Sequence, residues 1–168
     1  MDIVVNDTNI FLDLISIGLL DASFELPIKF HTVDYIIEEI INEEQNAEVA
    51  ALIKEGKLYV KEFDENEFSE IIDLYESRKN NVSVADCSVW YYAKKNDYRL
   101  ITGDGKLRSS ATADGVTVSG ILYLTDMLVE YKIIDERVMA VKLKELCKIN
   151  KRLPQKLIEE RIREYENS

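Results

Sequence analysis

The sequence predicts an α/β fold, a three-layer α/β/α sandwich around a central, mostly parallel, twisted sheet of about five strands, followed by C-terminal helices. Two observations support this fold class. Short runs of β-branched and other apolar residues alternate with longer helical patterns along the chain. Strands separated by helices of this kind form parallel βαβ units. The chain has 168 residues, of which 46% are hydrophobic and 32% charged, which suits one domain that buries its own core.

In the first half of the chain, strands and helices alternate three times. Ile3-Val4-Val5 is an uninterrupted β-branched run, as expected for a strand buried on both faces. Further strands are predicted at residues 27–32 and 58–63. Helices are predicted over about residues 8–20, over residues 34–42 and after Asp64.

The second half continues the same alternation. A strong helical pattern covers residues 83–95, and strands are predicted at residues 100–102 and 116–118. Further helices are predicted after Asp104 and over about residues 122–130 and 136–146. The remaining segment alternates basic and apolar residues, the pattern of an amphipathic helix that stops or restarts near Pro154.

Charge is distributed unevenly along the chain. Its 21 Lys and Arg against 32 Asp and Glu give a net charge of -11. Residues 1–141 hold 13 bases and 27 acids, a net of -14, whereas residues 142–168 hold 8 bases and 5 acids, a net of +3. We therefore divide the chain into a domain at 1–141 and a basic helical extension at 142–168, packed on or beside the domain. A uniformly acidic surface would repel nucleic acid. The extension is the one concentrated source of positive charge in the sequence, so it is the segment that could contact a nucleic acid.

Composition also limits location and chemistry. The two cysteines, Cys87 and Cys147, lie far apart in sequence, as is usual in a reducing compartment. The first residues lack a basic segment, and no uncharged apolar run approaches the length of a membrane span. We therefore expect a cytoplasmic protein that does not bind membranes. With His31 as the one histidine, a multi-histidine metal site is excluded.

Two carboxylates are predicted at the same edge of the sheet. Asp7 follows the first strand directly and Asp104 follows the fourth. Ligands of parallel sheets bind at the carboxyl ends of the strands, near a switch in strand order. Each residue also has a structural explanation, because Asp7 suits a helix N-cap and Asp104-Gly105 is a common turn signal.

Two further acids lie on predicted helices. Asp86 lies beside an apolar helix face, where a carboxylate is costly unless it is paired, and a metal ion is one such partner. Ser83-x-x-Asp86 is also a capping box, and the residue can serve both roles. In the helix after the second strand, Glu38 and Glu39 border the isoleucine stripe on opposite sides, and periodicity does not choose between them.

Together these motifs resemble the PIN domain family, known for metal-dependent ribonucleases that include the toxins of toxin–antitoxin pairs. The resemblance covers roughly residues 1–131 and depends on four weak motifs in the family's order. It assigns the family's four acids to Asp7, Glu39, Asp86 and Asp104, with Glu38 as the fallback for Glu39. The supporting positions that would orient these carboxylates are Thr8, Asn9, Ser83 and Thr102. Leu107 departs from the pattern, because many members have an aromatic residue there.

The resemblance implies an endoribonuclease that uses Mg²⁺ or Mn²⁺ and leaves a 5′-phosphate and a 3′-hydroxyl. The donor set agrees, because these cations prefer oxygen ligands, and crowded carboxylates repel one another unless cations are present. RNA is the expected substrate, and the sequence does not choose between RNA and DNA. The resemblance also allows for a partner antitoxin and for a homodimer.

Three other classes of protein share parts of this pattern. A haloacid-dehalogenase-like phosphatase requires a second Asp two residues after Asp7, where this chain has Asn9. A response-regulator receiver requires an acid pair, a phosphoacceptor Asp and a Lys that the sequence lacks at the matching places. A non-catalytic nucleic-acid-binding or regulatory protein on the same scaffold stays open as the alternative, because four carboxylates are necessary for this chemistry without being sufficient.

Overall fold

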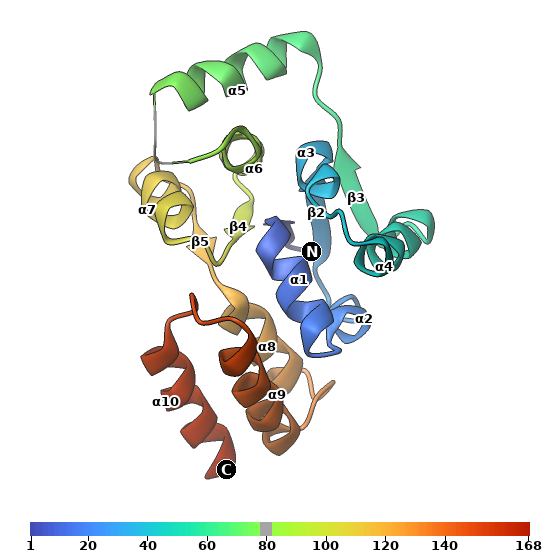
Figure 1. Cartoon of the computed structure of the whole chain (residues 1–168), viewed down its shortest axis with the longest axis vertical. Helices are drawn as coiled ribbons and strands as arrows, with labels where there is room; N and C mark the ends of the chain where they lie inside the picture. Colours follow the sequence, from blue (N-terminus) through green and yellow to red (C-terminus); the bar gives the residue numbers. More distant parts are fainter. Residues whose placement is uncertain (78–81) are drawn as a thin grey trace.

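Parallel strands form the centre of the computed structural model, which describes residues 1–77 and 82–168 (Figure 1). The strands of the described part are β1 (Ile3–Asn6), β2 (Lys29–Val33), β3 (Leu58–Lys61), β4 (Arg99–Ile101) and β5 (Val118–Ser119). They pair in the order β3-β2-β1-β4-β5, and every pairing is parallel. The predicted α/β class, with a parallel sheet of five strands, is confirmed.

Helices cover both faces of the sheet. They are α1 (Thr8–Ser16), α2 (Leu20–Ser23), α3 (Asp34–Glu38), α4 (Glu43–Lys54), α5 (Glu65–Ser77), α6 (Val84–Asn96), α7 (Gly105–Ala113), α8 (Ile121–Glu130), α9 (Glu136–Ile149) and α10 (Gln155–Glu166). Figure 1 shows α5 and α6 on one side of the sheet and α1, α4 and α9 on the other. Helix α6 packs across β1, β2 and β4, so the middle of the sheet lies in the core.

Two predicted helices are shorter than expected. The helix predicted over residues 8–20 ends at Ser16, because Gly18 turns the chain with a φ of +70° before α2 begins. The helix predicted over residues 34–42 ends at Glu38. Helix α4, which was not predicted, begins after Asn42, whose side chain accepts a hydrogen bond from the Gln45 amide at 3.0 Å and caps the new helix.

The C-terminal helices pack onto the sheet domain. Helix α9 ends at Ile149 and α10 begins after Pro154, so the predicted restart near that proline is confirmed. The two helices pack against each other, and α9 also contacts α1 and α8. Arg161 and Tyr165 of α10 both donate hydrogen bonds to Asp126 of α8. In the described parts of the chain, no helix combines the length and apolar character needed to cross a membrane.

Candidate active site

The sheet topology places Asp7 and Asp104 at one edge. Strand β1 is central and pairs with both β2 and β4, so the strand order reverses around it. Asp7 follows β1 and Asp104 comes three residues after the end of β4. The Asp7 amide donates to the carbonyl of Ile101, the last residue of β4, at 3.0 Å. This is the switch point at which ligands of parallel sheets bind.

Asp7 is a buried carboxylate held by two donors. Its side chain is 3% exposed. Oδ1 accepts from the Thr8 amide at 2.8 Å, and Oδ2 accepts from the Thr102 hydroxyl at 2.7 Å. These bonds fix the carboxylate and stabilise its charged form. Asp7 also serves as the N-cap of α1, so its structural and site roles coincide.

Burial nevertheless raises the pKa of Asp7 to about 6. The negative charges of Asp86 and Glu39 contribute to the same shift and oppose the two hydrogen bonds. A carboxylate that is buried among other carboxylates favours either a proton or a cation beside it.

Asp104 is the N-cap of α7. Its Oδ1 accepts from the amides of Lys106 at 2.8 Å and Leu107 at 2.9 Å. Its own amide donates to the Thr102 hydroxyl at 3.1 Å. Thr102, fully buried at the end of β4, therefore joins Asp7 to the Asp104 loop through one hydroxyl group.

Asp86 lies in the first turn of α6. The predicted capping box with Ser83 is present, since Asp86 Oδ2 accepts from the Ser83 amide at 2.9 Å and Ser83 Oγ accepts from the Asp86 amide at 3.0 Å. Burial raises the pKa of Asp86, and the charge of Asp104 raises it further. Electrostatic coupling thus links Asp86 to Asp7 and to Asp104.

The structure distinguishes Glu39 from Glu38 by their contacts. Glu39 follows α3 directly, and its Oε2 accepts from the Thr8 hydroxyl at 2.5 Å. Thr8 thus contacts Asp7 through its amide and Glu39 through its side chain. Burial raises the pKa of Tyr35, and the charges of Asp34 and Glu38 raise it further, so the charge of Glu38 acts on Tyr35.

The four predicted acids therefore interact in pairs through their charges, but each one also has local hydrogen-bond partners. Across residues 1–77 and 82–168, no group of three or more His, Cys, Asp or Glu side chains is arranged to hold a metal ion. Helix capping accounts for the absence of such a group, because the carboxylates of Asp86 and Asp104 accept hydrogen bonds from backbone amides at helix N-termini. Of the supporting residues, Thr8, Ser83 and Thr102 bond directly to these acids, while Asn9 is exposed.

A cavity of about 830 Å³ opens beside Asp104. It lies between α1, the Asp104 loop and the turn that joins α9 to α10, and its polar lining includes Asn9, Lys106 and Arg152. Asp13 also lines this cavity, and sequence reasoning did not single it out. Asp13 is 5% exposed, and the one signal for it was an acid inside the apolar pattern of the first helix.

Comparison with known protein families identifies the family. A family model described as a PIN domain matches residues 3–167, nearly the whole chain. No curated protein sequence matches. VapBC2 from Rickettsia felis, solved bound to a DNA fragment from its promoter, is 15% identical, with 70% of this chain and 98% of that chain covered and a TM-score of 0.48.

Two further solved structures are similar at the same level. A PilT N-terminus domain protein from the archaeon Sulfolobus solfataricus is 15% identical, with 73% of this chain and 89% of that one covered and a TM-score of 0.46. FitAcB from Neisseria gonorrhoeae is 16% identical, with 68% and 95% covered and a TM-score of 0.43. Because the family model covers almost every residue, the chain belongs to the PIN domain family.

Proposed function

We propose that this protein is a metal-dependent endoribonuclease that hydrolyses phosphodiester bonds at the edge formed by Asp7, Glu39, Asp86 and Asp104. The observation that carries the proposal is the electrostatic coupling of these acids around the ends of β1 and β4 in a PIN domain. Their repulsion and the raised pKa of Asp7 are what a bound cation would relieve.

The donor set fits Mg²⁺ or Mn²⁺, because all four side chains offer carboxylate oxygens and Mg²⁺ is held by carboxylates together with water and substrate phosphate. Asp7, Glu39, Asp86 and Asp104 would hold the cation. When bound, the cation supplies a water of lowered pKa and neutralises charge that develops on the phosphate. The protein's own part is positioning. Thr102 and the Thr8 amide fix both oxygens of Asp7, and the Thr8 hydroxyl fixes Glu39.

The direct test is cleavage of single-stranded and structured RNA by the purified protein with Mg²⁺ or Mn²⁺. We expect cleavage to fall at least about a hundredfold in Asp7→Ala and in Asp86→Ala, because each substitution removes a ligand of the cation. Chelation with EDTA should abolish it. Cation-dependent cleavage that survives both substitutions would come from a contaminating ribonuclease. If the wild-type protein does not cleave RNA with either cation, the proposal is refuted.

As a finer proposal, the chain acts as the toxin of a toxin–antitoxin pair. Expression of the wild type should then arrest growth, and Asp7→Ala should relieve the arrest at equal protein levels. A small neighbouring reading frame with a DNA-binding motif should encode the antitoxin and restore growth when coexpressed. Unimpaired growth with active wild-type protein would reject the toxin role and leave the nuclease proposal intact.

The competing function is a non-catalytic PIN-like protein that binds nucleic acid or regulates another protein. The observation that favours it is the engagement of Asp86 and Asp104 in helix caps, with no metal-holding group formed among residues 1–77 and 82–168. It predicts RNA binding without cleavage under every cation condition. Binding and cleavage measured on the same oligonucleotide therefore separate the two functions.

A further inference from the structure

The turn between α9 and α10 lies against the Asp104 loop. Arg152 in this turn lines the 830 Å³ cavity beside Asp104 and also a second cavity of about 560 Å³. The second cavity is bounded by the end of β5 and by α7 and α10. Its lining contains two guanidinium groups, those of Arg108 and Arg152. Both cavities include Gly103 and Gly105, the neighbours of Asp104. Arg152 therefore stands between two hollows that flank a predicted site residue.

Side-chain contacts hold this turn in place. Asn150 Nδ2 donates to Oδ1 of the buried Asp13 on α1 at 3.0 Å, and Asn150 Oδ1 accepts from the Arg152 amide at 3.1 Å. Gln155 Nε2 donates to the Asn150 carbonyl at 3.2 Å. Leu153, 5% exposed, packs beside Gly103. The backbone that carries Arg152 is thus fixed before any ligand binds, which lowers the entropic cost of binding.

Cationic groups around Asp104 have no acidic partner in the part of the chain that the structure describes. Among residues 1–77 and 82–168, Lys106, Arg108 and Arg152 form no salt bridge, although the chain has 32 acids for 21 bases. The Arg108 guanidinium lies over Gly120, where a Cβ would be 2.8 Å from Nη2, so the absent side chain leaves room for it. Lys106, Arg108 and Arg152 are therefore available to meet the negative charge of a ligand.

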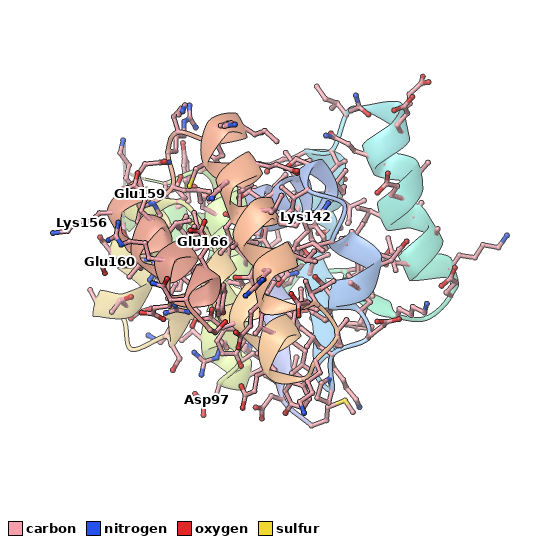
Figure 2. The ribbon with its side chains drawn as sticks, turned by 90° about the horizontal axis from the view of Figure 1, so that it is seen from below. Asp97, Lys142, Lys156, Glu159, Glu160 and Glu166 are labelled. Atoms are coloured by element: carbon pink, nitrogen blue, oxygen red, sulfur yellow. The ribbon has the colours of Figure 1, made fainter. Side chains whose placement is uncertain are left out.

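The turn itself is positively charged. Residues 150–154 contain 2 bases, Lys151 and Arg152, and no acid, a net of +2, whereas residues 155–168 contain 3 bases and 4 acids, a net of -1. Figure 2 shows Lys156 pointing away from α10, with Glu159 and Glu160 on the same helix. The turn is therefore locally positive, whereas α10 carries a small net negative charge.

We propose that the turn at residues 150–154 binds the phosphodiester backbone of the RNA strand on the side of the site next to Asp104, with Arg152 as its main phosphate ligand. This inference rests on the proposed function and deepens it. A guanidinium group matches two phosphate oxygens with two parallel donors. Lys106 and Arg108 would contact the neighbouring phosphates from the two cavities. These cations offset the repulsion between the strand and the acidic edge.

The test compares two substitutions that remove the same charge. Binding of a fluorescein-labelled single-stranded RNA is measured by anisotropy in EDTA at several salt concentrations, for Arg152→Gln and for Lys156→Gln. We expect Arg152→Gln to weaken binding roughly tenfold and to reduce the slope of log affinity against log salt by about 0.7. Lys156→Gln should leave both quantities near the wild-type values. Melting temperatures of both variants establish that they are folded.

The outcomes separate this inference from the proposed function. Equal binding by Arg152→Gln and Lys156→Gln would overturn the role of the turn, even if the wild type cleaves RNA. Absence of RNA binding by the wild type at low salt would overturn it as well. Weakened binding in Arg152→Gln without wild-type cleavage would support the turn and refute the nuclease. Displacement of the RNA by polyglutamate at equal charge would assign the turn to an acidic protein segment instead.

Discussion

At the scale of single residues, Asp7 is a buried carboxylate with a high desolvation cost, at the place where we propose that a cation binds. Asp7 is 3% exposed and has a pKa raised to about 6, yet both its oxygens accept hydrogen bonds. Neutral side chains at this place would avoid the desolvation of a charge. Unfavourable electrostatic energy of this kind, shared by several neighbouring acids, is typical of functional sites.

A divalent cation should therefore stabilise the protein. We expect millimolar Mg²⁺ or Mn²⁺ to raise the Tm by roughly 3–6 °C when the cation is at about ten times its Kd. Asp7→Asn or Asp104→Asn should remove most of this shift, measured by thermal denaturation with and without the cation. Asp97→Asn is a matched control, because Asp97 lies just before β4 at the opposite edge of the sheet (Figure 2). A wild type that does not respond to either cation would contradict a shared metal site.

Asp13 makes a separate prediction about pH. Burial raises its pKa above the ordinary 3.8, although a hydrogen bond from Asn150 opposes the shift. Above pH 3.8 the folded state holds this proton more tightly than the unfolded state, so the contribution of Asp13 to stability falls as pH rises towards the folded pKa. Asp13→Asn should therefore match the wild type near pH 3 and melt at a higher temperature at neutral pH. A Tm difference that is independent of pH would refute this explanation.

How far the sequence predicts the site depends on the residue. Asp7, Asp86 and Asp104 follow recognisable local signals, because strand ends and caps are visible in the chain. Glu39 is different, since both borders of the isoleucine stripe carry an acid and the choice depends on the hydroxyl of Thr8, 31 positions away. Asn150 and Asp13 are 137 positions apart, and no periodicity reports such a contact.

At the scale of elements, strands and most long helices were predictable, whereas α4 was missed and helix ends were less predictable. Apolar runs mark β1 and α6 clearly, whereas Gly18 ends a helix within a pattern that reads as continuous, and the helix that begins after Asn42 was not predicted. Gly18 has a φ of +70°, a conformation that costs other residues free energy. The chain turns there because glycine is tolerated, not because the apolar spacing changes.

A substitution at this glycine should be costly for that reason alone. Gly18→Ala should destabilise the protein by about 1–2 kcal/mol, measured by urea denaturation. The new Cβ would be 3.8 Å from Lys142 Nζ, an ordinary contact, so the cost is conformational. Gly105→Ala is the matched control. It lies at the first residue of α7 with open space around it and no positive φ, so alanine should be neutral or slightly stabilising there. Equal effects of the two substitutions would show that the left-handed turn is not the cause.

At the scale of the whole molecule, the basic extension contributes to the core as well as to the charge. Leu143 and Leu146 of α9 are fully buried, as is Ile158 of α10. Deletion of residues 142–168 would therefore expose apolar core residues in addition to removing a net charge of +3. Loss of RNA binding in such a truncation would not identify a contact, and single charge substitutions are the appropriate test of this segment.

We expect the extension to unfold together with the sheet domain. Leu143→Ala leaves a cavity where α9 packs and should cost about 2–5 kcal/mol, or roughly 5–15 °C in Tm. Trp90, the one tryptophan, is fully buried in α6, so its fluorescence follows the sheet domain, whereas far-UV circular dichroism follows all helices. The Tm values from both signals should fall by the same amount in Leu143→Ala. In Val141→Ala, which alters an exposed side chain of the same helix, both Tm values should stay near those of the wild type. A Trp90 transition at the wild-type temperature, with a separate earlier loss of helix, would instead make residues 142–168 an independently unfolding extension.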